Sequence, residues 1–214
     1  MAYTLGDLKS RIADDLARSD LSAQISNAIT DAIEHYKTTR FYFNEKTANN
    51  LTTFSTVVAQ AYYTSADSPD IPLFFEIDDI FCNIGGINRP LRLRDADTLQ
   101  LLIRTNLVQG DPYDWAWMGD QLIFYPLPNA VRTITMMGAY EIPAPTSDTD
   151  STNVWISEAF ELIRCYAKFL LFGHVIRDMD QAGDMAQLAQ LALGKLEAKT
   201  SLKRATGRVA PTEF

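Results

Sequence analysis

The sequence predicts an α+β protein in which the two ends of the chain form a helical bundle and the middle forms a small, mostly antiparallel β-module. Near both ends, apolar residues recur every three or four positions, as on the buried faces of amphipathic helices. In the middle, the pattern changes to runs rich in Thr, Val and Tyr, separated by Gly, Pro and Asn. The order of helices, strands and helices therefore predicts an inserted β-rich module.

The domain organisation that we expect has four segments. They are an N-terminal helical hairpin (1–44), the inserted β-rich module (45–141), the long C-terminal helices that complete the bundle (142–202) and an extended C-terminal tail (203–214). The length of 214 residues fits one domain, or one domain with an insertion.

The hairpin is expected to contain two short amphipathic helices. Thr4, followed three residues later by Asp7, is a short capping box for the first helix. Ser19 and Asp20 break this helix and can cap the second. A hairpin cannot bury its two apolar stripes alone, so a partner is needed. The stripes consist of Leu5, Leu8, Ile12 and Leu16, and of Leu21, Ile25, Ala28, Ile29, Ala32, Ile33 and Tyr36.

Three consecutive aromatic residues, Phe41, Tyr42 and Phe43, follow Arg40 at the end of the hairpin. Such a cluster usually seals a core where a helix gives way to a strand. A platform for stacking nucleic-acid bases would carry interleaved basic residues, and only Arg40 is nearby. We therefore interpret the cluster as part of the core.

The β-module is expected to contain six strands and one short helix. Gly85-Gly86 separates two apolar runs and predicts a β-hairpin turn. Asp95 is suited to cap the helix. The expected strands cover residues 51–63, 74–84, 87–93, 115–117, 121–125 and 131–140, and the expected helix covers residues 98–106.

Residues 153–178 predict one long helix around which the bundle is organised, with Asn153 as its cap. Residues 165–172 are apolar nearly all round, and Lys168 is the one break. Such a helix needs neighbours on several sides. The hairpin is one neighbour, and an Ala-rich helix over residues 180–202 is the other.

We expect neither a secretory signal peptide nor a membrane span. The N-terminus lacks the basic-then-apolar order of a signal peptide, and the apolar run is too short to cross a bilayer. Cys82 and Cys165 lie in apolar contexts, which favours buried free thiols over a disulfide. These features predict synthesis in the cytoplasm and no membrane partner.

The net charge of −8 is unevenly distributed along the chain. Residues 195–214 hold five basic and two acidic residues, a net of +3, whereas residues 1–194 carry a net charge of −11. An acidic body binds nucleic acid poorly, because phosphate binding depends on Lys and Arg. The basic end is typical of an interaction tail, and a solvated terminus fits its composition equally well.

No catalytic or metal-binding arrangement is recognisable. His35 and His174 lack a Cys or a second His at the spacing of a metal site. Adjacent carboxylates such as Asp14 and Asp15 point in different directions and make a poor two-carboxylate site. The residues alone therefore predict a non-enzymatic interaction protein that needs no cofactor or metal.

Several stretches together resemble the head-to-tail adaptor proteins of short-tailed bacteriophages. This family includes the tail tubular protein A type and the head-completion proteins that dock under a portal. The stretches are DLKSRIADDLARSDL, RFYFNE, FFEIDDIFCNIGGINRPLRLRD, DQLIFYPLPNA, VWISEAFELIRCYAKFLLFGHVIRD and KRATGRVAPTEF. They are spread over nearly the whole chain, and none is a catalytic motif.

The resemblance implies a structural role in the virion, at the head-to-tail junction. Adaptors of this kind assemble a dodecameric ring on the portal protein, seal the DNA exit and form a platform for the tail nozzle and tail fibres. DNA passes through the channel without specific binding. The C-terminal segment is implied to reach the portal, and its candidate portal-binding residues are Lys199, Lys203, Arg204, Arg208, Val209 and Phe214.

Two other interpretations stay open. The chain could be a different neck or tail protein, a completion or terminator ring that binds a tail tube in place of a portal. It could also be a small tail-associated hydrolase, which would need a buried carboxylate or a His–Cys site in a cleft.

Overall fold

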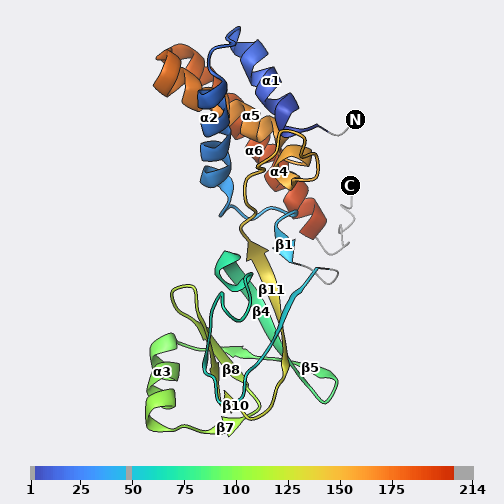
Figure 1. Ribbon diagram of the computed structural model, residues 1–214, viewed down its shortest axis with the longest axis vertical. Coiled ribbons are helices and arrows are strands. Elements are labelled where there is room, and N and C mark those ends of the chain that lie inside the picture. Colours follow the sequence, from blue (N-terminus) through green and yellow to red (C-terminus); the bar gives the residue numbers. More distant parts are fainter. Residues whose placement is uncertain (1–2, 47–49, 205–214) are drawn as a thin grey trace, which may run out of the picture. The chain divides into compact units, whose positions relative to one another are not determined.

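The computed structural model describes residues 3–46 and 50–204 (Figure 1). The chain divides into two compact units. The helical unit comprises Met1–Phe43 and Ile142–Phe214, and the β unit comprises Asn44–Glu141. Helices flank a strand-rich middle, so the prediction of an α+β fold is confirmed.

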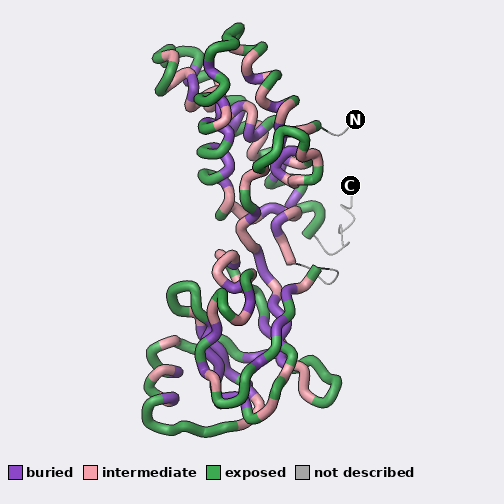
Figure 2. Tube along the Cα trace, viewed as in Figure 1, coloured by how far each residue is buried: buried purple, intermediate pink, exposed green. Residues whose placement is uncertain are grey.

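The helical unit is built from both ends of the chain. Its α5 packs against α1, α2 and α6, and Figure 2 shows buried residues along the facing sides of these helices. The elements are α1 (Leu5–Leu16), α2 (Ser22–Tyr36), α4 (Val154–Ser157), α5 (Phe160–Leu170), the π-helical turn η2 (Leu171–Ile176) and α6 (Met179–Arg204).

The first helix begins as the sequence predicts. The Thr4 side chain accepts a hydrogen bond from the Asp7 amide at 3.1 Å, and the Asp7 carboxylate accepts one from the Thr4 amide at 2.8 Å. The second helix and its buried stripe are present as predicted, but its predicted cap was wrong, because Leu21 is the N-cap and makes no side-chain cap bond. Asp20 instead binds Arg18 at 2.7 Å, and this ion pair occupies the carboxylate that would have capped the helix.

The single long helix predicted for residues 153–178 is interrupted. Asn153 caps it as expected, since its side chain accepts from the Trp155 amide at 3.0 Å. The helix then breaks at Glu158 and Ala159, whose φ angles are −113° and −115°. Glu158 is bound at this point by Tyr42 and Lys199. The apolar residues keep a helical spacing through this point, so the break comes from tertiary contacts that override the local preference for a helix.

Of the aromatic cluster after α2, Phe41 lies in the core as predicted, whereas Tyr42 and Phe43 are half-buried. Phe41 is fully buried, and its ring stacks on Phe43 with 5.1 Å between centroids. Both rings meet Trp155 edge-on, and the Trp155 indole N–H donates to the Ile142 carbonyl at 2.9 Å. The start of the long helical region is thereby fixed to the end of the hairpin.

The β unit contains two main sheets and one α-helix. One sheet has the order β1-β11-β4-β5, with β2 also paired to β11, and the other has the order β3-β9-β8-β6. The elements are β1 (Glu45–Lys46), β2 (Thr52–Ser55), β3 (Tyr62–Tyr63), η1 (Ile71–Leu73), β4 (Phe74–Ile84), β5 (Ile87–Pro90), β6 (Arg92–Leu93), α3 (Ala96–Thr105), β7 (Gln109–Gly110), β8 (Asp114–Trp117), β9 (Leu122–Tyr125), β10 (Leu127–Pro128) and β11 (Thr133–Tyr140).

The turn signals of this unit were interpreted correctly, and two long strands were not. β4 and β5 pair across Gly85-Gly86, both of which have positive φ. The strand predicted over 51–63 is divided into β2 and β3, because residues 56–61 form a loop. The strand predicted over 87–93 is divided as well, since β6 leaves β5 and pairs parallel with β8.

The core of the β unit has two layers. Side chains of both sheets, among them Ile80, Ile134 and Phe124, form one buried cluster between the sheets. Leu99 and Ile103 of α3 pack with Ile123 in a second cluster beside β8 and β9. The module is therefore closed by its own helix.

Replacing Ile163 with Ala should lower the free energy of unfolding of the helical unit by about 2–5 kcal/mol. Ile163 is fully buried on α5, so the change leaves a cavity. Leu170→Ala should cost less, because Leu170 is only half-buried. Chemical denaturation followed by circular dichroism measures both losses, and equal losses would contradict this placement of the buried face of α5.

Candidate docking site at the end of the C-terminal helix

The last turns of α6 carry three of the residues that the sequence singles out. Lys199, Lys203 and Arg204 all lie within the helix, which extends to Arg204. Basic side chains in the last turn of a helix are stabilised by the partial negative charge of its free carbonyl groups. Arg208, Val209 and Phe214, the other three predicted residues, lie outside the described residues.

Tyr42 brings two of these lysines together. The Lys203 ammonium lies 3.7 Å from the centroid of the Tyr42 ring, and the Lys199 ammonium lies 4.7 Å from it. A cation over an aromatic face is attracted by the negative charge density of the ring. The ring therefore holds two positive charges on one short segment of α6.

Glu158 completes this arrangement, which we call the Tyr42 cluster (Tyr42, Glu158, Lys199 and Lys203). Lys199 donates to Glu158 Oε2 at 2.8 Å, and the Tyr42 hydroxyl donates a hydrogen bond to the same oxygen. The Glu158 carboxylate compensates one of the two ammonium charges. Because Lys199 and Lys203 carry two positive charges and Glu158 one negative charge, the cluster keeps a net positive charge.

The ionisation of the cluster follows from these contacts. The hydrogen bond from Lys199, assisted by the one from Tyr42, lowers the pKa of Glu158. The same bond to Glu158 raises the pKa of Lys199. Burial, together with the bond to Glu158, raises the pKa of Tyr42, whose hydroxyl stays protonated and keeps donating. At neutral pH Glu158 is therefore ionised and Lys199 charged, and the ion pair between them is kept.

The cluster is anchored in the core of the helical unit. The Tyr42 amide donates to the Thr200 hydroxyl at 3.2 Å, and that buried hydroxyl donates to the Leu196 carbonyl at 2.8 Å. On its other side, the Tyr42 ring meets Phe43 edge-on at 5.4 Å. The basic end of α6 is thus held at a defined place.

Two members of the cluster, Tyr42 and Glu158, were missed as site residues. Tyr42 stood in a predicted core cluster, and Glu158 in a predicted helix. They are 116 positions apart, so no local spacing could join them. The sequence held no signal that joins them, because the hairpin and the Ala-rich helix were both expected to pack against the long helix and not against each other.

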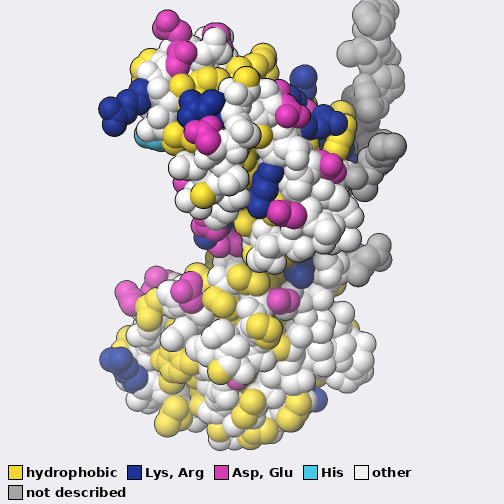
Figure 3. Space-filling model, turned by 45° about the horizontal axis from the view of Figure 1, so that its top comes forward, with side chains coloured by type: hydrophobic (Ala, Val, Ile, Leu, Met, Phe, Trp, Pro, Cys, Tyr) yellow, Lys and Arg dark blue, Asp and Glu magenta, His cyan; other side chains and the backbone are white. Residues whose placement is uncertain are grey.

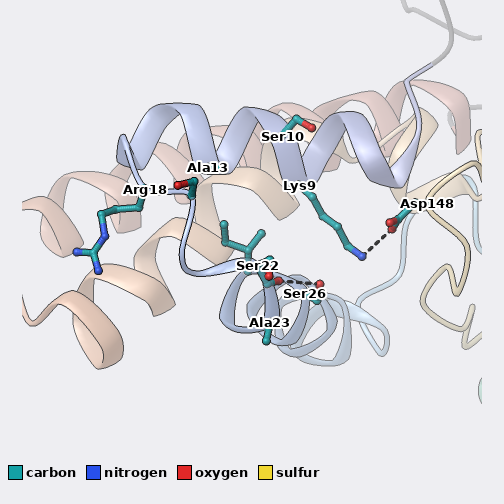
Figure 4. A pocket seen from close by; sticks show the side chains of 10 residues that line it. Lys9, Ser10, Ala13, Arg18, Ser22, Ala23, Ser26 and Asp148 are labelled. Carbon is teal, nitrogen blue, oxygen red and sulfur yellow. Dashed lines mark hydrogen bonds and ion pairs between the residues drawn. The ribbon is translucent and has the colours of Figure 1, made fainter.

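Two grooves of the helical unit can be searched for side chains suited to catalysis or ligand binding. One, of about 380 Å³, lies between α1 and α2, and Figure 4 shows Lys9 pointing across it to Asp148. The two side chains form an ion pair of 2.6 Å. Small residues, including Ala13 and Ser26, form much of the lining. This groove offers a paired charge and small side chains, without a His or Cys among its lining residues.

The second groove, of about 600 Å³, lies between α5 and α6. Its carboxylates are Glu158, which binds Lys199, and Glu161, which lies 3.4 Å from Arg164. A general acid needs a carboxyl group with a raised pKa, and that of Glu158 is lowered. The carboxylates of this groove therefore do not form the site that a glycoside hydrolase would need.

Of the His and Cys side chains, His35 is engaged and both cysteines are buried, whereas His174 is exposed and lines a third groove, of about 290 Å³, together with Asp31. His35 stacks on Tyr166 with 4.5 Å between ring centroids. Cys82 and Cys165 are free and buried, as predicted, and burial raises the pKa of Cys82 to about 11. Within residues 3–46 and 50–204, no group of three or more His, Cys, Asp or Glu side chains is placed to hold a metal ion, and no helix is long and apolar enough to cross a membrane.

Comparison with known proteins identifies a family. A family model described as SU10 adaptor protein matches residues 3–212 of the chain. No curated protein matches the sequence. The matched range includes both the helical unit and the β unit, so a single family accounts for the two together.

Glu158→Gln should remove a pH-dependent part of the stability. Because the folded pKa of Glu158 is lowered, its ion pair stabilises the fold above the unfolded pKa, and this contribution is lost as the pH falls through the folded pKa. The difference in free energy of unfolding between wild type and E158Q should be about 1 kcal/mol or less at pH 7. It should shrink in acid, as denaturation at a series of pH values would measure.

Tyr42→Phe is the matched control for this variant. It removes the hydroxyl donor and keeps the ring under Lys203. The Lys199–Glu158 ion pair remains, so Y42F should keep a larger share of the pH dependence than E158Q. A wild-type and E158Q difference that does not change with pH would contradict the assigned role of Glu158.

Proposed function

The chain belongs to the SU10 adaptor protein family, and from this premise we propose that it is a structural adaptor at the head-to-tail junction of a bacteriophage virion. In this proposal, copies of the chain form a ring of twelve under the portal protein. The ring seals the DNA exit and gives the tail nozzle and tail fibres a platform. Membership of an adaptor family is consistent with a protein that has no catalytic activity.

The Tyr42 cluster is the observation that supports portal docking most directly. It fixes the end of α6, from which the segment with Arg208, Val209 and Phe214 continues. A segment that starts from a fixed anchor has fewer conformations to lose on binding than one that starts from a mobile end. The local charge at the anchor is basic, so an acidic docking surface on the portal would complement it.

The proposed route of DNA is supported by composition. The net charge of −8 makes the chain a poor partner for phosphate groups, and repulsion keeps the duplex from adhering to a channel wall. The DNA would therefore pass through the ring without specific binding. A structure of the assembled ring should show an acidic or neutral lumen, and a lumen lined by basic side chains would contradict this part of the proposal.

Deleting residues 203–214 should abolish binding to purified portal protein while the helical unit still folds. The deletion removes Lys203 from the Tyr42 ring together with all the residues that follow, and it leaves Lys199 and Thr200 in place. Co-sedimentation with portal measures binding, and circular dichroism with size measurement reports on folding and ring formation.

A single substitution provides a sharper comparison. Lys203→Gln removes one positive charge at the Tyr42 ring, whereas Lys195→Gln removes one from an exposed position two turns earlier on α6. K203Q should weaken portal binding and K195Q should not.

If the truncated protein binds portal normally, the assigned role of the C-terminal end is wrong. If the wild type binds a tail tube and ignores portal, the terminator alternative is favoured.

A further inference from the structure

The exposed side of α6 carries a row of four side chains, which we call the α6 stripe (Asp184, Leu188, Leu191 and Lys195). Steps of four, three and four residues place all of them on one face of the helix. Leu188 and Leu191 are 45% and 63% exposed, and Asp184 and Lys195 are exposed as well. The stripe therefore presents two apolar side chains between one negative and one positive charge.

The stripe lies outside the core of the helical unit. The buried side of α6, with Ala182, Ala189 and Leu196, packs against α5, whereas Leu188 and Leu191 line the groove between the two helices. On the face of the helical unit that Figure 3 shows, hydrophobic side chains also reach the surface among charged ones of both signs. What distinguishes the α6 stripe is the order of its side chains along the helix.

The two charges of the stripe are unpaired in the part of the chain that the structure describes. Neither Asp184 nor Lys195 forms an ion pair with another described residue. They cannot pair with each other, because they lie about 16 Å apart along the helix axis. Both charges are therefore available to a second molecule.

The stripe is complementary to itself. A two-fold axis perpendicular to the helix, midway between Leu188 and Leu191, exchanges these two leucines. The same axis exchanges Asp184 and Lys195, which lie at equal distances from this midpoint. Two copies of α6 placed antiparallel on this axis bring the leucines together at the centre and join Asp to Lys at each end. Such a contact, in which two residues exchange their partners across the axis, is the rule in a two-fold dimer.

We propose that the free protein forms a two-fold dimer in which the α6 stripes of two copies pack antiparallel. Burial of Leu188 and Leu191 of both copies is favourable and drives the contact. The Asp184–Lys195 pairs at its two ends fix the direction and register of the helices. The groove of about 600 Å³ beside α6 gives the second helix room to approach. The dimer is distinct from the proposed ring, because a two-fold pair does not lead to a ring.

Other occupants match the stripe less well. A neighbouring copy in a head-to-tail ring contact would have to offer a cation to Asp184 and an anion to Lys195 on a different surface. The third groove of the helical unit offers Asp31, but no Lys or Arg is among its lining residues. In the groove between α1 and α2, Lys9 and Asp148 already pair with each other. DNA is a poor match, because the stripe is neutral overall and phosphate binding depends on positive charge.

The test measures the mass of the full-length protein by sedimentation equilibrium over a range of concentrations, without portal. The wild type should show an equilibrium between monomer and dimer. Leu191→Asp places a charge at the centre of the contact and should raise the dimer dissociation constant at least about tenfold. Gln190→Asp adds the same charge at an exposed position of α6 outside the stripe and should leave the constant unchanged. Thermal unfolding shows whether the variants are folded, and a misfolded L191D is replaced by Leu191→Ser.

Exchange of the two charges tests the antiparallel register. Asp184→Lys alone and Lys195→Asp alone each place like charges together at both ends, so each should weaken the dimer. The double variant D184K/K195D should restore it, and so should a mixture of the two single variants, because opposite charges then meet again. A parallel pair would already join like charges in the wild type, so the single variants would not weaken it.

Each other outcome overturns the inference. A wild type that stays monomeric at every concentration, or a dimer that L191D leaves unchanged, shows that the stripe is no dimer contact. Closed rings that form without portal and that L191D weakens assign the stripe to a head-to-tail contact. Single charge variants that dimerise as tightly as the wild type contradict the antiparallel register. None of these measurements involves portal, so the proposed function is tested separately, by the deletion of residues 203–214.

Discussion

Burial of α5 is the constraint on which the rest of the helical unit depends. Its apolar surface includes Phe160, Leu162 and Ile163, which need cover on more than one side. The N-terminal hairpin supplies α1 and α2, and the C-terminus supplies α6, so the two ends of the chain must meet. The β unit, which comprises the middle of the chain, can then leave the helical unit and return to it at one place. Trp155 fixes that place, because it contacts the Phe43 ring and donates to the Ile142 carbonyl, the residues at which the chain leaves and re-enters the unit.

The two units present surfaces of different character. At the end of α6, the Tyr42 cluster gathers cations and compensates them only in part. In the β unit, residues 56–61, 106–110 and 126–131 hold exposed apolar side chains and no charged residue. A surface of one kind binds poorly to a partner suited to the other, because an unpaired buried charge is costly.

Local signals in the sequence predicted local structure well. The Thr4–Asp7 box, the Asn153 cap and the Gly85-Gly86 turn were all recognised, because each depends on residues within a few positions of one another. The break at Glu158 could not be predicted, since it accompanies contacts from Tyr42 and Lys199, which are remote in sequence. The loop that divides the run 51–63 was missed for a similar reason. Its composition, with two adjacent Val residues, is typical of a strand. Only the bonds to β10 and to Tyr63, which are made by tertiary contacts, show that residues 56–61 form a loop.

Two tyrosines, Tyr42 and Tyr63, connect a core to the surface above it. Tyr63 is fully buried, yet its hydroxyl accepts a hydrogen bond from the Val57 amide in the loop of residues 56–61. Tyr42 packs against Phe43, yet its ring and hydroxyl hold Lys203 and Glu158. In each case an apolar ring fixes the position and a polar or π contact orders the surface above it. Ordering these surfaces before assembly reduces the entropy lost on binding. Core packing and the order of the surface are therefore linked in this protein through these two side chains.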